Sequence, residues 1–247
     1  MKILALLSLS FPLLVLPFVS PASALNVPER LVYDVSWTGI KAGTAVQEVT
    51  AHGGELRIVS TVHSAGWLTP IFPVEDRTES QLSRGSGTEP LGMPILYREK
   101  INEGKTHTMK EARFDQQGLK AHTQDFRKKT EKIDSISART FDSLSCIYFV
   151  RSSELVIGKS IFIDIYDCKR LWNTEVRVVR REETSTPLGR FKTIVVKPLL
   201  KSEGLFARTG EVTVWLSDDS LRIPVRMTTK VKLGNITATL VGGSYWP

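Results

Sequence analysis

The sequence predicts an all-β protein, a mainly antiparallel curled sheet or barrel-like architecture with one short central helix. Apolar and polar residues alternate with a period of two in many short runs, of which residues 31–37 are an example, and this period is typical of strands with one buried face. Turn signals such as Gly53-Gly54 separate the runs. Helical spacing of apolar residues occurs in a single segment, at residues 142–155.

The alternating runs predict strands on both sides of that helix. Those before it are residues 31–37, 44–50, 56–63, 94–101, 107–114 and 119–126. Those after it are residues 160–166, 174–181, 191–200, 211–216, 225–233 and 236–241. A sheet with this many strands curls or closes on itself, and its concave side then holds either an apolar cavity or a packed core.

The predicted helix lies near the middle of the chain. Asp142 is its expected N-cap. Because the helix separates two β halves, two subdomains joined near Arg139 are one interpretation of the chain. The preferred interpretation is one continuous β domain at residues 25–247.

The N-terminus has the pattern of a secretion signal that is removed after export. Lys2 precedes an apolar run at residues 3–19, and Ala22-Ser23-Ala24 places small residues where signal peptidase cleaves. We therefore expect residues 1–24 to be a signal peptide and the mature chain to begin at Leu25 in the periplasm. A transmembrane anchor is the alternative, but the run of about 17 residues is close to the lower limit for a spanning helix. No later segment is apolar enough to span a bilayer, and no cysteine stands at the cleavage site to accept a lipid anchor.

The charge of the mature chain is mildly positive. Removal of residues 1–24 leaves 223 residues with a formal charge of +6, because Lys2 is the only charged residue of that segment and the whole chain carries +7. This surplus is compatible with contact to anionic lipid or polysaccharide, and solubility explains it equally well. The chain has no dense Lys/Arg block interleaved with aromatic residues, so we do not expect it to bind nucleic acid.

Two cysteines in an oxidising compartment allow a disulfide. Cys146 lies in an apolar segment and Cys168 in a polar turn, 22 residues further on, and they form no Cys-x-x-Cys motif. A Cys146–Cys168 bridge and two free thiols are therefore equal alternatives.

The residues that carry most enzymatic chemistry form no recognisable motif in the sequence. The histidines His52, His63, His107 and His122 lack metal-ligand spacing, so we expect neither a metal nor another cofactor. The sequence has no Gly-x-Ser-x-Gly elbow and no phosphate-binding glycine loop. The apolar neighbours of Cys146 argue against a reactive thiol. We therefore expect a non-catalytic protein.

One pair of adjacent carboxylates is conspicuous, at Asp218 and Asp219. Such a pair could bind a cation or divide acid and base roles. In Ser217-Asp218-Asp219-Ser220, between two predicted strands, the side chains are more commonly bonded to their own backbone, so a turn is the preferred interpretation.

Several segments together resemble a bacterial exported family, domain of unknown function 3108. The segments are Tyr33-Asp34-Val35-Ser36-Trp37-Thr38-Gly39-Ile40-Lys41-Ala42-Gly43, Phe141-Asp142-Ser143-Leu144-Ser145, Thr186-Pro187-Leu188-Gly189-Arg190-Phe191, Val196-Lys197-Pro198, and Val214-Trp215-Leu216-Ser217-Asp218-Asp219 with Arg222-Ile223-Pro224-Val225. The resemblance covers nearly the whole mature chain, implies an exported and β-rich protein, and brings no catalytic residues. The C-terminal strand, turn and returning strand also resemble the curved sheets of periplasmic lipoprotein carriers of the Lol type, a likeness of fold alone.

The preferred function is binding of an apolar or amphipathic ligand, such as a lipid or a lipoprotein segment, in the cell envelope. Aromatic residues that could line a concave face are Trp37, Trp67, Phe72, Phe206 and Trp215. Core packing or the anchoring of a loop is the structural alternative for each of them.

Two other functions stay open. The protein could be an envelope scaffold that adds strands to partner proteins by edge pairing, with the apolar loop at residues 68–74 as a docking element. It could also be an envelope hydrolase that uses Asp218, Asp219 or Glu211 as carboxylates.

Overall fold

The structure, a computed structural model, describes residues 25–85, 91–199, 211–231 and 233–246. The predicted signal peptide and Phe206 lie outside these residues. The first half contains β1 (Glu29–Trp37), β2 (Ile40–His52), β3 (Glu55–Ser64), β4 (Glu75–Leu82), β5 (Pro94–Glu103), β6 (Thr106–Asp115), β7 (Lys120–Asp125) and β8 (Thr130–Ser135). The second half contains β9 (Thr140–Asp142), α1 (Cys146–Ser152), β10 (Ser160–Tyr166), β11 (Leu171–Thr186), β12 (Gly189–Leu199), β13 (Val212–Ser217), β14 (Pro224–Val231) and β15 (Gly234–Gly243).

These strands form one 15-stranded sheet, and the prediction of an all-β protein with a curled sheet and a short helix is confirmed. β1 pairs with both β2 and β15, so the first and last strands lie side by side in the middle of the sheet. From there β1 to β8 form a meander in one direction, and β15 to β9 form one in the other. β8 and β9 are the two edges. The pairs are antiparallel, apart from the parallel pair of β9 and β10.

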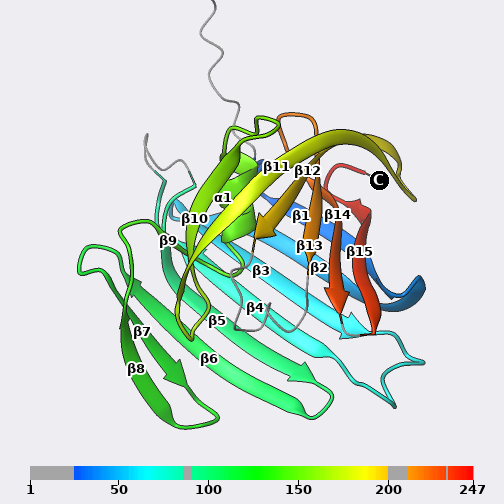
Figure 1. Ribbon diagram of the computed structural model, residues 1–247. Coiled ribbons are helices and arrows are strands. Elements are labelled where there is room, and N and C mark those ends of the chain that lie inside the picture. Colours follow the sequence, from blue (N-terminus) through cyan, green and yellow to red (C-terminus); the bar gives the residue numbers. More distant parts are fainter. Residues whose placement is uncertain (1–24, 86–90, 200–210, 232, 247) are drawn as a thin grey trace, which may run out of the picture.

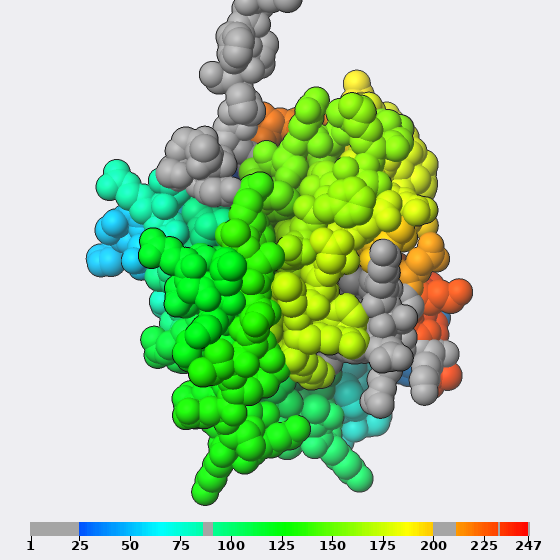
Figure 2. All heavy atoms as spheres, turned by 60° about the vertical axis from the view of Figure 1, so that its left-hand side comes forward, coloured from blue at the N-terminus to red at the C-terminus, as the bar shows by residue number. Residues whose placement is uncertain are grey.

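The sheet curls so that its two ends approach each other (Figure 1). Tyr166 of β10 makes the connection: its hydroxyl lies 2.8 Å from Thr123 Oγ1 of β7 and donates to Asp134 of β8. The ring of Phe114 on β6 packs edge-on against Tyr166, with centroids 6.0 Å apart. Figure 2 accordingly shows the green strands β6–β8 next to the yellow-green strands β10 and β11. The curl therefore encloses a core without a complete ring of hydrogen-bonded strands.

The core lies on the concave side of the sheet, where α1 is enclosed (Figure 1). Tyr148 and Val150 of α1 are buried in the main apolar cluster together with Tyr97 of β5 and Val176 of β11. A short helix can be stable here because its side chains pack against strands from both halves of the chain, since isolated helices of this length are not stable in water.

The helix is shorter than residues 142–155, and the prediction that Asp142 is its N-cap is wrong. Ser145 occupies the N-cap position. Asp142 ends β9 instead, and its Oδ1 accepts the backbone N–H groups of Leu144 and Ser145, both at 2.8 Å. Its Oδ2 accepts the Ser80 hydroxyl at 2.5 Å, so the buried carboxylate joins β9 to β4. An aspartate that bonds the backbone two and three residues ahead forms a turn, and this turn precedes the helix.

Three strands contain too few apolar residues for alternation to predict them. β4 is polar on both faces, with Arg77 and Glu79 on one side and Asp76 and Ser80 on the other. β8 is an edge strand whose side chains are almost all exposed, and β9 has only three residues. Their pairing with neighbouring strands, rather than their own pattern, makes them strands.

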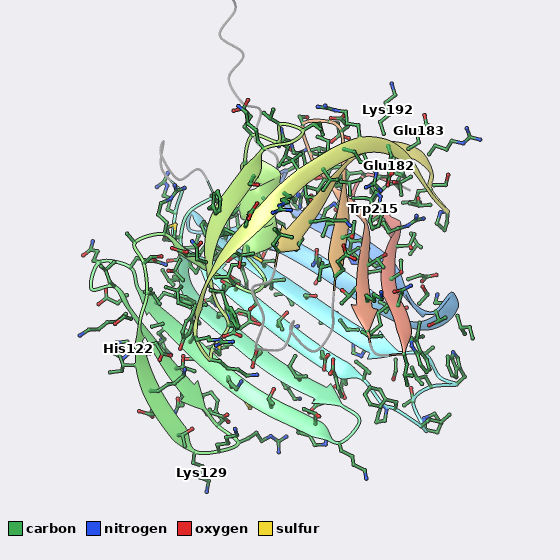
Figure 3. The ribbon with its side chains drawn as sticks, viewed as in Figure 1. His122, Lys129, Glu182, Glu183, Lys192 and Trp215 are labelled. Carbon is green, nitrogen blue, oxygen red and sulfur yellow. The ribbon has the colours of Figure 1, made fainter. Side chains whose placement is uncertain are left out.

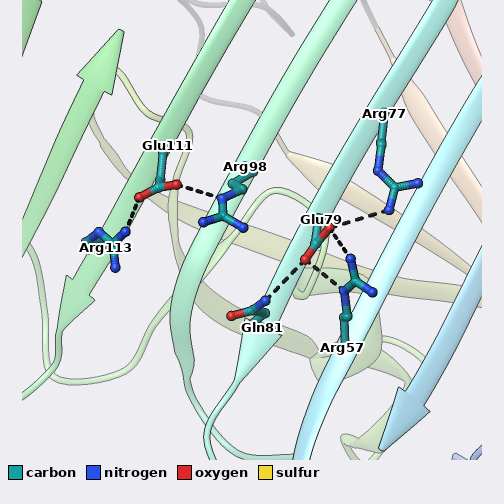
Figure 4. A network of polar contacts seen from close by, with 7 residues as sticks. All are labelled: Arg57, Arg77, Glu79, Gln81, Arg98, Glu111 and Arg113. Atoms are coloured by element: carbon teal, nitrogen blue, oxygen red, sulfur yellow. Dashed lines mark hydrogen bonds and ion pairs between the residues drawn. The ribbon is translucent and has the colours of Figure 1, made fainter. Parts of the chain in front are cut away.

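Ion pairs across strands cover the outer face of this polar part of the sheet (Figure 4). Glu79 accepts two bonds of 2.8 Å from Arg57 on β3 and lies 3.5 Å from Arg77. Glu111 on β6 lies 2.6 Å from Arg98 on β5. The bonds from Arg57 lower the pKa of the Glu79 carboxyl. Such cross-strand charge pairs stabilise neighbouring strands, and on this face they lie beside the buried side chains of Val59 on β3 and Leu96 on β5.

A buried ion pair connects the helix to the start of β1. Arg151 of α1 and Glu29 form two parallel bonds of 2.7 Å, and their side chains are only 1% and 0% exposed. Arg151 also donates to the carbonyl oxygen of Leu221, at 3.0 and 3.3 Å, and the Tyr245 hydroxyl donates to Glu29 at 2.9 Å. Burial favours the neutral guanidinium, but the hydrogen bonds to Glu29 and the negative charges around it together outweigh this effect and raise the pKa of Arg151. The charged pair therefore joins four segments that are distant in the sequence.

We predict that Arg151→Met lowers the free energy of unfolding by about 3–5 kcal/mol, because it leaves the Glu29 carboxylate buried without its partner. The double variant Glu29→Met/Arg151→Met should regain much of this loss, since no isolated charge remains. Arg30→Met is the matched control: Arg30 pairs with Glu48 at 3.3 Å, with side chains that are 53% and 51% exposed, and its loss should cost less than about 1 kcal/mol. Urea denaturation at pH 7 measures all three. Equal effects of Arg151→Met and Arg30→Met would contradict the assigned role.

Candidate functional site

An apolar cavity of about 620 Å³ lies at the end of the sheet where β1, β2, β3 and β15 approach the loop between β3 and β4. In Figure 1 this end is at the lower right, where the loop is cyan. The lining residues are Val35, Ser36, Trp37, Ala42, Gly43, Val62, His63, Ser64, Leu68, Ile71, Phe72, Val74, Asp76, Glu103 and Ile236. A concave, mainly apolar site of this volume with a few polar groups is typical of small-molecule sites.

One face of β1 leads from the core into the cavity. Glu29, Leu31, Tyr33, Val35 and Trp37 alternate onto the same side of the strand. Leu31 and Tyr33 are 0% exposed, whereas Trp37 at the other end is 40% exposed. The same strand therefore supplies the buried carboxylate, the core and the cavity wall in sequence.

The register next to β1 places small residues at the cavity. Val35 pairs with Gly43 on β2, and Gly43 pairs with Ser64 on β3. A Cβ atom on Gly43 would lie 2.4 Å from the backbone oxygen of His63. Glycine is therefore required for the close approach of β2 and β3.

The loop at residues 65–73 forms one wall and is fixed to β2. The backbone N–H of Ala65 donates to Ala42 O at 2.7 Å. The indole N–H of Trp67 donates to Lys41 O at 2.8 Å. Trp67 therefore anchors the loop and is not among the residues that line the cavity.

The end of this loop is fixed to the turn after β5. The backbone N–H of Gly104 donates to Pro73 O at 2.8 Å. The ring of Phe72 lies against Gly104, where an added Cβ would be 2.6 Å from the ring. Contacts at both ends therefore hold Phe72 at the cavity.

Large apolar side chains are exposed around the opening. Ile71 is 77% exposed, Phe72 46% and Ile236 42%, and all three line the cavity. Ile40 and Leu233 are also exposed, and they adjoin Trp37 through strand pairing and a 2.7 Å bond from its indole to Leu233 O. Exposed apolar residues that gather in one place indicate an interaction site more strongly than isolated ones do.

Two carboxyl groups form the polar part of the wall. Asp76 on β4 is 9% exposed, and its Oδ1 accepts the backbone N–H of Asn102 at 2.8 Å. Glu103, at the end of β5, is hydrogen-bonded to Asp76. The Glu103 residue as a whole is exposed, but its carboxyl is partly desolvated at the cavity wall. This desolvation, and then the charge and hydrogen bond of Asp76, raise the pKa of Glu103 to about 6. The Glu103 carboxyl therefore takes up a proton near pH 6, in contact with Asp76.

The structure brings two of the five predicted aromatic residues together, since Trp37 and Phe72 both line the cavity. Trp215 is elsewhere. Figure 3 shows it on β13 near Glu182 of β11, to which its indole N–H donates. The guanidinium of Arg226 lies 6.0 Å from the centre of its ring. These contacts and its partial burial in the second apolar cluster give Trp215 a packing role.

The cysteines are free thiols in the structure, the second of the two alternatives. Burial raises the pKa of Cys146 to about 12 and holds that of Cys168 well above its ordinary value. Thiols with such pKa values are weak nucleophiles at neutral pH.

The interpretation of Asp218 and Asp219 as a turn is confirmed. Asp219 Oδ1 accepts the backbone N–H groups of Leu221 and Arg222, at 2.9 and 3.0 Å. Asp218 forms an exposed ion pair of 2.8 Å with Arg181. The carboxylates therefore bond to different partners and do not face a common site.

The remaining candidates for chemistry are separate from one another. Glu211 forms an ion pair of 2.9 Å with Lys197. Among the residues that the structure describes, His, Cys, Asp and Glu form no group of three or more that could hold a metal. In the same residues, no helix is long and apolar enough to cross a membrane.

The sequence did not point to Asp76 and Glu103. Asp76 lies in a strand whose polar pattern conceals it, and Glu103 lies in a segment that reads as a turn. The pairing of β4 with β5 brings them together, because Glu103 forms a bridge with Val74, two residues before Asp76. The local signal was the pair Glu75-Asp76 directly after the apolar loop, and no local pattern indicates Glu103.

Comparisons with known proteins give a family and a fold. The family model described as "Protein of unknown function (DUF3108)" matches residues 32–241. A search of curated proteins gives no match. Among solved structures, the chain is similar to the β-barrel-like protein of domain of unknown function DUF1849 from Brucella abortus, with a TM-score of 0.55, 14% identity, and coverage of 88% of this chain and 97% of that one. A second is the hypothetical protein CT021 from Chlamydia trachomatis, with a TM-score of 0.40, 4% identity, and coverage of 89% and 87%.

We predict that the Glu103 carboxyl titrates near pH 6 rather than near its ordinary pKa of 4.5. Asp76→Asn should lower the pKa of Glu103 toward that ordinary value, because it removes the neighbouring negative charge. Glu48→Gln, an exposed carboxylate change on β2, should leave it unchanged. Carbon-13 NMR of protein with labelled glutamate measures the titration. A wild-type pKa near 4.5, or no response to Asp76→Asn, would show that the two carboxyls do not interact.

Proposed function

Because the chain belongs to the DUF3108 family, whose function is unknown, we propose a function from the site itself: this is an exported, non-catalytic envelope protein that binds an amphipathic ligand. The ligand is a lipid or a lipoprotein segment, and its apolar part occupies the cavity between β1–β3, β15 and the loop at residues 65–73. The cavity of about 620 Å³ carries this proposal. It has room for an aliphatic chain and exposes Trp37, Ile71, Phe72 and Ile236 to it.

The fixed position of the loop supports binding in a preformed site. Trp67 and Ala65 bond to β2, and Pro73 bonds to Gly104, so the wall stands without a ligand. A ligand that covers these exposed apolar side chains removes them from contact with water. Each 100 Å² of apolar area covered contributes roughly 2.5 kcal/mol to the binding free energy, before the costs of association.

The second part of the proposal is that the protein is exported to the periplasm. A cleaved signal peptide at residues 1–24 would release a chain that begins at Leu25 into the periplasm, where amphipathic molecules of the envelope are available. The mass of the protein recovered from cells tests this part, because cleavage after Ala24 removes a defined segment.

The contacts at the sheet edges favour ligand binding over strand addition. β9 is buried at all three of its residues. The Asp134 end of β8 is attached to β10 through Tyr166, while the other side chains of β8 are exposed. Strand addition needs a free and accessible edge. The carboxylates considered for hydrolysis, Asp218 and Glu211, are each held in a separate ion pair.

We predict that Val62→Trp weakens binding of a neutral apolar probe, N-phenyl-1-naphthylamine, by at least about tenfold, equivalent to roughly 1.4 kcal/mol. Val62 lines the cavity, and the larger side chain would fill it. Thr61→Trp is the matched control, since Thr61 is the preceding residue on β3 and faces the opposite side of the sheet. Probe fluorescence with the mature protein measures both affinities. The proposal fails if the two variants bind the probe as tightly as the wild type, or if the wild type does not bind it.

A further inference from the structure

Resting on the ligand cavity proposed above, we infer that the ligand is an amphiphile with a cationic head group, a primary or quaternary ammonium, which Asp76 and Glu103 hold. The apolar body of the ligand then lies against β1, β15 and Phe72. The proposal adds a head-group chemistry to a cavity that otherwise selects only for an apolar chain.

The charges of the lining point to this chemistry. The chain has 33 Lys and Arg against 26 Asp and Glu, yet the residues that line this cavity include Asp76 and Glu103 and no Lys or Arg. Lys41, on the neighbouring β2, is engaged with Asp34 at 2.6 Å. A net positive protein therefore presents a locally negative wall, and an anionic ligand would meet two carboxyls without a counter-charge.

The positions of Asp76 and Glu103 suit the binding of a cationic head group. Asp76 is 9% exposed and is positioned by the backbone N–H of Asn102 at 2.8 Å, whereas Glu103 is exposed. One carboxyl is therefore fixed in the wall and the other is accessible at its edge. An ammonium placed between them would offset the negative charge of the two carboxyls, as protonation of Glu103 does at lower pH.

Aromatic rings in the same cavity add a second kind of cation site. Trp37 and Phe72 line the cavity along with the carboxyls. Cations, quaternary ammonium groups above all, are attracted to the faces of Trp and Phe rings. Carboxylates and aromatic rings together therefore accept an ammonium more readily than a neutral sugar or a phosphate.

Binding should weaken in acid. Protonation of Glu103, whose pKa is about 6, removes one of the two charges that attract the head group. The other titratable groups around the pair are His63 on β3, which lines the cavity, Glu75 on β4, and His107 on β6, which lies 3.1 Å from Asn102 Oδ1. Lys105 lies in the turn directly after Glu103 and Gly104. Because several charged or titratable groups surround the pair, pH alone does not identify the carboxyls and variants are needed.

The experiment measures by calorimetry the affinity of the mature protein for three amphiphiles whose alkyl chains have ten carbons: decyltrimethylammonium, decyl maltoside and decanoate. Each is used below its critical micelle concentration. At pH 7.5 we expect the ammonium compound to bind at least about tenfold more tightly than decanoate, although the net charge of the protein favours the opposite order. In Asp76→Asn/Glu103→Gln this ratio should fall to about one, and Glu103→Gln alone should reduce it. Glu48→Gln, which removes an exposed carboxylate on β2, should leave the ratio unchanged. From pH 7.5 to pH 5 the preference for the ammonium compound over the maltoside should decrease.

The outcomes separate this inference from the proposed function. If all three amphiphiles bind with equal affinity and Val62→Trp abolishes binding, the cavity is a ligand site but the head-group inference is wrong. If the preference for ammonium survives in Asp76→Asn/Glu103→Gln, other groups select the head and the assignment is wrong. If none of the three binds, both the inference and the proposed function fail. A thermal unfolding curve that matches the wild type confirms that each variant is folded. If the double variant is not folded, the single variant Glu103→Gln, at an exposed position, replaces it in the test.

Discussion

The buried pair of Glu29 and Arg151 is the interaction on which the arrangement of the chain depends. Two charges that are 0% and 1% exposed are stable only with matched geometry and further hydrogen bonds, and here Leu221 O and the Tyr245 hydroxyl supply them. These partners belong to the first strand, the helix, the β13–β14 turn and the C-terminal segment. The pair therefore specifies how the two halves of the sheet, which meet at β1 and β15, enclose the helix between them.

β1 connects this buried ion pair to the candidate site. Its inward face begins with Glu29, continues through Leu31 and Tyr33 in the core, and ends with Val35 and Trp37 in the cavity. Because the side chains of a strand alternate strictly, a shift of one residue would move the carboxylate, the core and the cavity wall to the other face together. The register with β15 shifts at Val32/Tyr33 and the register with β2 shifts at Val35/Ser36, so the ion pair and the pairing of Trp37 with Ile236 hold different segments of the strand. Stability and the shape of the cavity depend on one strand.

The local pattern of the sequence predicts much of the fold, and long-range pairing explains the remainder. Strands such as β1, β3 and β10 alternate clearly, and their expected positions are confirmed. β4 was not predicted, because its inner Asp76 and Ser80 are satisfied by partners on β5 and β9 that no local pattern reveals. The same reason applies to the site: Trp37 and Phe72 were identifiable as large aromatic residues, whereas Asp76 and Glu103 become a pair only when β4 and β5 lie side by side. The pairing of β1 with β15 also joins the two ends of the chain, and it cannot be inferred from the periodicity of either strand.

The most direct test of the account is native mass spectrometry of the protein recovered from the envelope of its own cells. The account predicts a chain that begins at Leu25 and carries a non-covalent amphiphile, with the adduct lost in Val62→Trp and retained in Thr61→Trp produced in the same way. A ligand-free wild-type protein, or an adduct that Val62→Trp retains in full, would contradict the conclusion that this cavity is the functional site.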